Sequence, residues 1–226
     1  SGAFHVTFQP AKSFFGVMKN PLIILLCVFV TSFSLYAEKD AKKNQFTKLS
    51  KLSDFQTEGT WIEEEGGVFH LKPRKGEEGW KRYGSYLWLK EQYGDFTCDF
   101  EFKVGKGGNS GFYFRISDKS DATLHGFEVQ LKDDHGKEKF GPHDVGGVIK
   151  TAGPKVNAVK PAGEWNRMVV QMKGSRLYVM LNEQIVQDID MEEMRPRDKP
   201  LARKGWIAIQ DHGQEFWVRN IRIKKG

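Results

Sequence analysis

Alternation of apolar and polar residues, from about Leu49 to the end of the chain, constrains the fold more than any other feature of this sequence. Residues i and i+2 of a strand point to the same face of a sheet, so a period of two indicates half-buried β-strands. One short helix is expected at residues 190–194, before Pro196. The predicted strands cover residues 96–104, 112–116, 127–131, 168–172, 177–181, 207–209 and 217–225.

Turn-forming sequences separate the predicted strands. Examples are GKGG at residues 105–108, KGS at 173–175 and DHG at 211–213. Because strands follow one another at short spacing without regular helices between them, the sequence predicts an all-β antiparallel sandwich or barrel. The 24 glycines and 8 prolines are typical of an ordinary globular protein, which excludes the collagen-like and disordered classes.

The first part of the chain is predicted to be an upstream extension followed by a signal peptide. Met18 and a lysine precede the apolar run LIILLCVFVTSFSLYA at residues 22–37, and a polar segment follows Ala37. A basic start, an apolar stretch and a small residue at the cleavage site define a secretory signal. The alternative is a membrane anchor, which needs about 20 mainly apolar residues. We expect a start at Met18, cleavage near Ala37, and three regions: extension and signal peptide at 1–37, polar linker at 38–48, and sandwich domain at 49–226.

The basic composition gives little information about partners. The chain has 35 Lys and Arg against 29 Asp and Glu, a net charge of +6. Loss of residues 1–37 would remove Lys12 and Lys19, leaving 33 basic residues and a charge of +4. These residues are scattered, whereas nucleic-acid-binding proteins concentrate them on one face. We therefore expect no nucleic-acid partner, and no membrane association after signal cleavage. Of the 2 cysteines only Cys98 would remain, which excludes a disulfide scaffold.

Polar side chains on otherwise apolar strands form the most distinctive set of residues. If the apolar positions face the core, the intervening positions share the opposite face of the sheet. An ordinary solvated surface is the alternative, because antiparallel sheets commonly have one wet face. The polar or amphipathic residues expected on this face are Tyr113, Arg115, Glu128, Gln130, Gln210 and His212.

A two-carboxylate glycosidase is not favoured by the spacing of acidic residues here. Glu128 and Asp133 are five strand positions apart, about 16 Å at ~3.3 Å per residue, and the odd offset puts them on opposite faces. Glycosidases that use two carboxyl groups hold them about 5 to 9.5 Å apart. Ordinary hydrolysis by this pair is therefore disfavoured.

A cluster of potential metal ligands lies at residues 133–144, which contain DDH at one end and HD at the other. Carboxylate oxygens are ligands for hard cations, so calcium is the metal to consider. The spacing matches no recognised ligand pattern, and charged loops are usually solvated. We assign no metal or other cofactor, and calcium remains the open alternative.

Four motifs occur in a characteristic order along the predicted strands. They are NSGFYFR (109–115), GFEVQ (126–130), KPAGEWN (160–166), and QDHG (210–213) followed by VRNI (218–221). Together they resemble the domain of unknown function 1080 family, also called the 3-keto-disaccharide hydrolase domain, from about residue 61 to 224. The resemblance implies a concanavalin A-like (LamG or glucanase-like) antiparallel β-sandwich of the jelly-roll type. It also implies export by a glycan-degrading bacterium, and hence a periplasmic or secreted location.

The resemblance implies which side chains form the site. Arg115, Glu128, Gln130, Gln210 and His212 would face a concave sheet. A ketone at C3 of a sugar acidifies the proton on C2, so a base can remove it and the C1 group can leave by elimination before water adds. This chemistry needs an acid/base and donors for the enolate oxygen. The hypothesis makes Glu128 or His212 the acid/base and Arg115 the enolate stabiliser, while the sugar contacts are Tyr113, Gln130, Gln210 and Asp211.

One departure from the family pattern concerns the substrate. The family usually has GAIY where this chain has GVIK at residues 147–150, so Lys150 replaces a tyrosine that would offer a stacking surface.

The leading interpretation is an exported hydrolase that acts on (3-keto-)disaccharides or glycosides, with carbohydrate as its partner. The alternative is a non-catalytic, lectin-like carbohydrate-binding module. His212 within reach of Glu128 would favour the enzyme, and a separation beyond about 8 Å would favour the binding module. The oligomeric state is left open.

Overall fold

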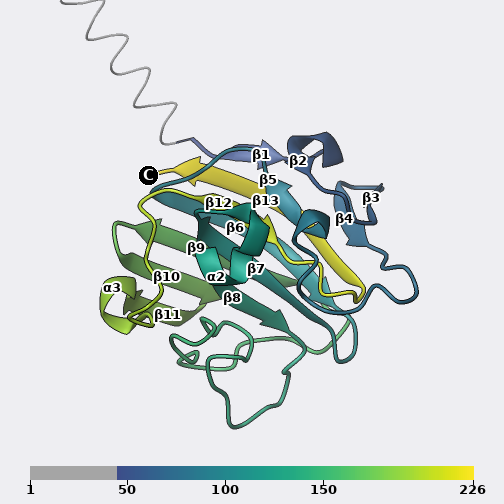
Figure 1. Cartoon of the computed structure of the whole chain (residues 1–226). Coiled ribbons are helices and arrows are strands. Elements are labelled where there is room, and N and C mark those ends of the chain that lie inside the picture. The colour runs from purple at the N-terminus through teal and green to yellow at the C-terminus, as the bar shows by residue number, and fades with distance from the viewer. Residues whose placement is uncertain (1–44) are drawn as a thin grey trace, which may run out of the picture. The chain divides into compact units, whose positions relative to one another are not determined.

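The computed structural model describes residues 45–226, which form two antiparallel β-sheets (Figure 1). The predicted signal peptide and most of the predicted linker lie outside the described residues. The last two linker positions, Thr47 and Lys48, belong to the first strand, so the folded domain begins slightly earlier than expected. Across residues 45–226, no helix has the length and apolar character needed to cross a membrane.

The larger sheet has eight strands in the order β11-β10-β9-β6-β13-β4-β3, with β1 paired to β13. Neighbouring strands run antiparallel throughout. The strands are β1 (Thr47–Leu49), β3 (Trp61–Glu64), β4 (Val68–Leu71), β6 (Phe96–Val104), β9 (Asn166–Lys173), β10 (Arg176–Leu181), β11 (Gln184–Asp190) and β13 (Phe216–Lys225).

The smaller sheet has five strands in the order β2-β5-β12-β7-β8. They are β2 (Phe55–Gln56), β5 (Leu87–Leu89), β7 (Asn109–Ile116), β8 (Phe127–Lys132) and β12 (Trp206–Ile209). The helices are short: η1 (Leu52–Asp54), η2 (Tyr83–Ser85), η3 (Lys119–Asp121), α2 (Ala122–His125) and α3 (Met191–Met194). Of these, α3 is the helical turn that the sequence predicts. Helix α2 contacts β7 and β8 on the outer face of the five-stranded sheet (Figure 1).

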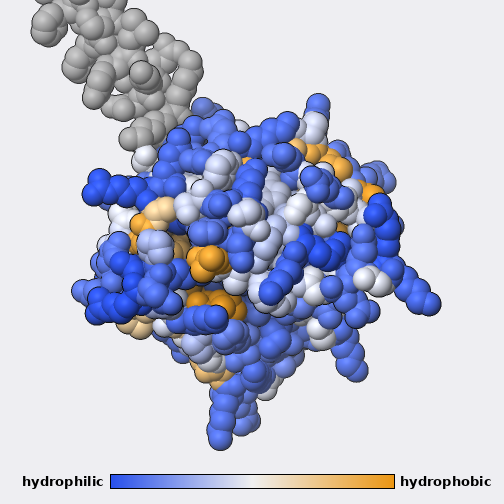
Figure 2. Space-filling view, in the orientation of Figure 1, coloured by the Kyte–Doolittle hydropathy of each residue, from blue (hydrophilic) through white to orange (hydrophobic). Residues whose placement is uncertain are grey.

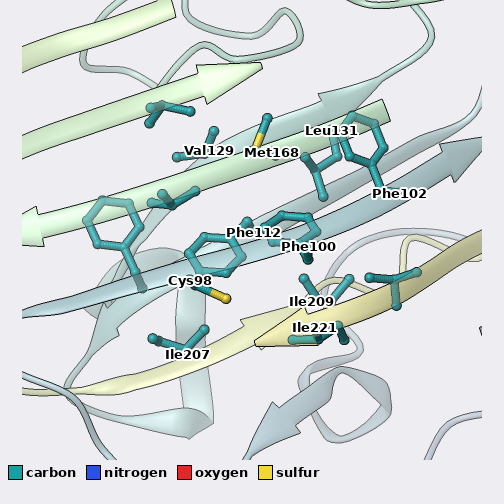
Figure 3. Packing of buried hydrophobic residues seen from close by; sticks show 14 of the residues in the cluster. Cys98, Phe100, Phe102, Phe112, Val129, Leu131, Met168, Ile207, Ile209 and Ile221 are labelled. Carbon is teal, nitrogen blue, oxygen red and sulfur yellow. The ribbon is translucent and has the colours of Figure 1, made fainter. Parts of the chain in front are cut away.

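The core lies between the two sheets and consists of the alternating apolar residues. Phe100 of β6 and Phe112 of β7 stack with their ring centroids 5.3 Å apart, which joins the two layers (Figure 3). Full burial of such a side chain contributes about 1.5–3 kcal/mol. The predicted antiparallel β-sandwich is therefore confirmed, because the apolar side chains of both sheets pack against one another in this core.

The outer surface is mostly hydrophilic, with small scattered hydrophobic patches on the face seen in Figure 2. Exposed large apolar side chains are isolated, Leu124 of α2 being the most exposed of them. Isolated apolar residues are normal on a soluble surface. These apolar residues do not mark a functional site, so the candidate site is built from polar side chains on the two sheets.

Candidate active site

The outer face of the five-stranded sheet carries two parallel rows of side chains. Strand register and hydrogen bonding align four positions in each row, on β7, β8, β5 and β12 and on the residues that directly adjoin β5 and β12. We call these eight residues the outer-face rows; the first is Trp88, Ala208, Tyr113 and Glu128, and the second is Tyr86, Gln210, Gly111 and Gln130. The intervening positions, such as Phe112 and Val129, point into the core. The predicted sharing of one face by Tyr113, Glu128, Gln130 and Gln210 is thus what the structure shows.

Glu128 lies directly against the backbone of Gly111. A Cβ atom added to Gly111 would lie 2.7 Å from the Glu128 carboxyl carbon and 2.8 Å from its Cγ. Any larger residue at position 111 would therefore collide with the carboxylate. The glycine creates the space in which the Glu128 side chain lies over the sheet.

Burial dominates the electrostatics of Glu128, which is only 9% exposed. Loss of hydration disfavours the ionised form and raises the pKa of Glu128 to about 7. A hydrogen bond from the Tyr113 hydroxyl and the positive charge of Lys199 act in the opposite direction but do not cancel the effect. Glu128 can therefore change protonation state close to neutral pH.

Lys199 is the cation whose charge lowers the pKa of Glu128. Its Nζ donates to the Thr123 carbonyl oxygen at 2.7 Å and lies 4.8 Å from the centre of the Phe127 ring. Burial lowers the pKa of Lys199 to about 8, although the negative charge of Glu128 raises it. Glu128 and Lys199 thus shift each other's pKa through their charges, although no ion pair within 4 Å joins them among residues 45–226.

Thr123 of α2 connects several groups around this pair. Its Oγ1 lies 3.3 Å from the Tyr113 hydroxyl and accepts a hydrogen bond from the Tyr83 hydroxyl at 3.2 Å. The same Tyr83 hydroxyl donates to Asp121 Oδ1 at 2.7 Å. Because Thr123 also binds Lys199, helix α2 holds Tyr113 and Lys199 on the same side of the sheet.

Two glutamine side chains in the second row have buried acceptors without a partner. Gln210 donates through Nε2 to the hydroxyls of Tyr86 and Tyr113, at 3.2 and 3.4 Å, and Gln130 donates to the His143 carbonyl at 3.3 Å. Both glutamines are more than nine-tenths buried, yet their Oε1 atoms have no hydrogen-bond partner within residues 45–226. Buried acceptors of this kind are normally satisfied, so these two covered oxygens are an exception that calls for an explanation.

Arg115 does not share this face, contrary to the prediction. A register shift between β12 and β7 and a φ of 53° at Arg115 interrupt the alternation, so Ile116 rather than Arg115 packs beside Tyr113. Such bulges redirect side chains in a strand. The Arg115 guanidinium instead donates to the Ala202 carbonyl at 2.6 Å, to Asp95 at 3.3 Å and to the Gly174 carbonyl at 3.2 Å. It is a buried cross-link at the end of the sandwich.

His212 follows β12 and is half-buried, with its backbone carbonyl accepting from the Gly79 amide at 3.3 Å. Burial lowers its pKa, and the charge of Asp211 opposes this effect. The groups that shift the pKa of Glu128 are Tyr113 and Lys199. Neither of the two predicted acid/base residues, Glu128 and His212, is among the groups that shift the pKa of the other.

Asp211, expected to contact sugar, is fully buried and binds protein groups. Its carboxylate accepts from both Nη atoms of Arg82, at 3.2 and 2.9 Å, and from the Gly213 amide at 2.8 Å. This arrangement ties the segment before β5 to the segment after β12. Asp211 has a structural role in holding the end of β12 next to the outer-face rows.

Replacement of Asp211 by alanine is expected to lower the free energy of unfolding by about 3 kcal/mol, because it leaves the Arg82 guanidinium and the Gly213 amide without their acceptor. Urea denaturation would measure this loss. Asp188→Ala is the matched control, since its ion pair with Arg176 is largely exposed and should contribute less than about 1 kcal/mol. Unchanged stability of Asp211→Ala with a raised KM would instead support direct sugar binding.

The acidic loop after β8 is neutralised by lysines. Asp144 lies 2.5 Å from Lys137 Nζ and 3.5 Å from Lys132 Nζ, and Asp134 lies 3.3 Å from Lys132 Nζ. In the part of the chain that the structure describes, no three His, Cys, Asp or Glu side chains are grouped to hold a metal ion. These carboxylates organise the loop through lysine and backbone contacts.

Sequence reasoning missed Lys199, Thr123, Tyr86 and the close approach at Gly111. Lys199 and Thr123 lie in segments without strand periodicity, so nothing in the sequence indicated which face they would reach. Gly111 was recognisable within the NSGFYFR motif. Its role became visible only with the register between β7 and β8.

The family model and the curated relative that match this chain agree on one family. A model of the 3-keto-alpha-glucoside-1,2-lyase-like domain matches residues 40–224. A relative from Bacteroides thetaiotaomicron, named 3-keto-disaccharide hydrolase, is 26% identical over 199 residues, covering 71% of this chain and 68% of the relative.

Solved structures show the same sandwich. A crystal structure from Parabacteroides distasonis, named "putative glycosyl hydrolase", has a TM-score of 0.68 and 26% identity, covering 81% of this chain and all of that one. A Bacillus subtilis protein with a galectin-like fold has a TM-score of 0.55 and 12% identity, covering 80% of this chain and 95% of that one. The second likeness concerns the fold alone and agrees with the expected lectin-like architecture.

Proposed function

The chain belongs to the family of 3-keto-alpha-glucoside-1,2-lyase-like domains, and from this premise we propose that it cleaves glycosides whose sugar carries a ketone at C3. Membership makes the chain a glycosyl hydrolase-like protein. The observation that most supports the more specific proposal is Glu128, a buried carboxylate with a pKa of about 7 among polar groups of one sheet face.

The proposed reaction begins with the Glu128 carboxylate taking the proton from C2 of the substrate. The electron pair of that C–H bond forms an enolate with the C3 carbonyl. The enolate then expels the C1 substituent, which leaves with a proton as an alcohol, and a C1–C2 double bond remains. Water adds its oxygen to C1 while a proton returns to C2. The net change is cleavage of one glycosidic bond by one water molecule.

A single carboxylate with this pKa suits elimination better than ordinary glycoside hydrolysis. General bases work best when their pKa is close to the operating pH. Ordinary glycosidases need a second carboxyl group at about 5 to 9.5 Å. Of the other acidic groups on this side, Asp121 accepts from the Tyr83 hydroxyl and the Leu124 amide, and Asp211 is bound to Arg82. The protonation behaviour of Glu128 therefore supports removal of a weakly acidic C–H proton.

Gln130 and Gln210 are proposed to orient the sugar. Their Oε1 atoms are unpaired and covered by protein, and a side-chain movement that uncovers them would let them accept from sugar hydroxyl groups. The Tyr113 hydroxyl, between Gln210 and Glu128, supplies a further polar contact. Such contacts would place C2 of the substrate next to Glu128.

Export to the periplasm or the medium remains part of the proposal, supported by the apolar run at residues 22–37. N-terminal sequencing of the protein recovered from the exported fraction should give a start near Glu38. Recovery of a chain that still includes the apolar run would contradict cleavage.

Turnover of matched substrates tests the proposed activity. The purified chain should release monosaccharide from a 3-keto-disaccharide and leave the same disaccharide with a C3 hydroxyl intact, because only the ketone acidifies C2. Equal cleavage of both would contradict the elimination route. Binding of the 3-keto-disaccharide without cleavage would favour a lectin-like module.

A further inference from the structure

Lys199 lies in a segment that the structure fixes at several points. This segment, residues 195–205, runs from α3 to β12 (Figure 1), and we call it the strap. Arg195 donates to the Lys199 carbonyl at 2.8 Å, and Arg115 donates to the Ala202 carbonyl at 2.6 Å. Gly205 pairs with Tyr93 through two backbone hydrogen bonds of 2.8 and 3.0 Å. A long, flexible side chain is therefore presented from an anchored backbone.

The Lys199 ammonium reaches the same side of the sheet as Glu128. Its Nζ binds the Thr123 carbonyl at 2.7 Å, and Thr123 Oγ1 lies 3.3 Å from the hydroxyl of Tyr113. Tyr113 is the residue directly opposite Glu128 in the register of β7 and β8. An ammonium group has three donors, so two remain after the bond to Thr123.

We propose that Lys199 is a catalytic residue whose ammonium binds the C3 oxygen of the substrate and stabilises the enolate formed when Glu128 removes the C2 proton. This inference rests on the proposed function. It assigns to Lys199 the task that the sequence had given to Arg115, whose guanidinium is used elsewhere. Positive charge aimed at a developing oxyanion is a strong form of transition-state stabilisation in a site withdrawn from water.

The charges around the pair set a narrow pH range. Burial lowers the pKa of Lys199 most, and the charge of Lys150 lowers it further, while Glu128, Asp121 and Asp198 raise it; the pKa is about 8 overall. Glu128 has a pKa of about 7. Carboxylate and ammonium therefore coexist mainly between about pH 7 and 8. We expect a bell-shaped profile of kcat/KM with its maximum in that range, described by two apparent values that belong to the coupled pair.

Substitution of Lys199 by methionine is expected to reduce kcat/KM on a 3-keto-disaccharide by about 10²- to 10³-fold, the usual loss for one oxyanion donor. The alkaline limb of the pH profile should disappear and the acid limb should move to higher pH. Lys199→Arg should recover most of the loss and retain activity at alkaline pH, because arginine stays protonated. Lys204→Met, an exposed lysine of the same strap, is the matched control and should behave as wild type.

A titration that does not depend on turnover separates this inference from the proposed function. NMR titration of the Glu128 carboxyl should show a higher pKa in Lys199→Met than in wild type, because a nearby positive charge has been lost. Wild-type activity and pH profile in Lys199→Met, together with inactive Glu128→Gln, would overturn the role of Lys199 alone. Borohydride trapping of substrate on Lys199 would also overturn it, since it would show an imine. Absence of any turnover by the wild type would instead remove the proposed function.

Discussion

Replacement of Glu128 by glutamine is expected to lower kcat/KM on a 3-keto-disaccharide by about 10²- to 10⁴-fold, the range that general acid–base catalysis contributes. Glutamine has nearly the same shape and keeps the contact with Gly111, but it cannot accept the C2 proton. Steady-state kinetics at pH 7.5 would measure the loss. Glu138→Gln, an exposed glutamate in the loop after β8, is the matched control and should retain full activity.

The same variant should be more stable than wild type above neutral pH. The pKa of Glu128 is about 7 in the folded protein and 4.5 in its ordinary environment. A raised pKa means that stability is fully present below about pH 4.5 and is lost as pH rises through 7. This difference corresponds to about 3 kcal/mol. Denaturant unfolding should therefore show equal stability at pH 4 and a more stable Glu128→Gln variant at pH 8.

Catalysis lost together with stability gained would identify Glu128 as a residue kept for its chemistry. A Glu128→Gln variant that is less stable than wild type at pH 8 would contradict the raised pKa. A variant that keeps full activity would contradict the role of Glu128 as base.

The second large effect is expected at Gly111. An alanine Cβ would lie 2.7 Å from the carboxyl carbon of Glu128, so the carboxylate must move aside. Because misplacing a reacting group by about 1 Å can cost 10²-fold in rate, Gly111→Ala should lower kcat by about that factor. The strand backbone can accept alanine, and overpacking should reduce the free energy of unfolding by only about 1–3 kcal/mol.

A double mutant separates displacement of Glu128 from general damage. If Gly111→Ala acts through Glu128, then adding it to Glu128→Gln should cause little further loss of activity. Multiplicative losses would contradict this explanation. Gly105→Ala is the matched control, because a Cβ there meets no atom within 4 Å and activity should be unchanged.

The fold and half of the candidate site followed from periodicity in the sequence. Glu128 and Gln130 lie on strand β8, and alternation alone placed them opposite the core-facing Val129. The same argument failed for Arg115, because a bulge with positive φ adds a residue to β7 and turns the side chain away. Periodicity cannot reveal a bulge within a run that still looks regular.

The remaining site residues depend on contacts between distant segments. Lys199 meets Thr123 across 76 residues, and Arg82 meets Asp211 across 129 residues. Neither pair belongs to a motif or to a continuous pattern. The pKa of Glu128 is likewise raised because tertiary packing buries its carboxyl group. Sequence alternation predicts only that Glu128 points away from the core, and so gives no sign of this burial.

Solvent isotope incorporation at C2 tests the central claim, that Glu128 removes the C2 proton, most directly. A 3-keto-disaccharide should be cleaved in deuterium oxide, with Glu128→Gln as the control for spontaneous exchange, and the released 3-keto sugar analysed by NMR. Elimination followed by hydration predicts one deuterium at C2, introduced with the enzyme's turnover. Product that keeps its original hydrogen at C2 would show direct hydrolysis at C1 and would contradict this account.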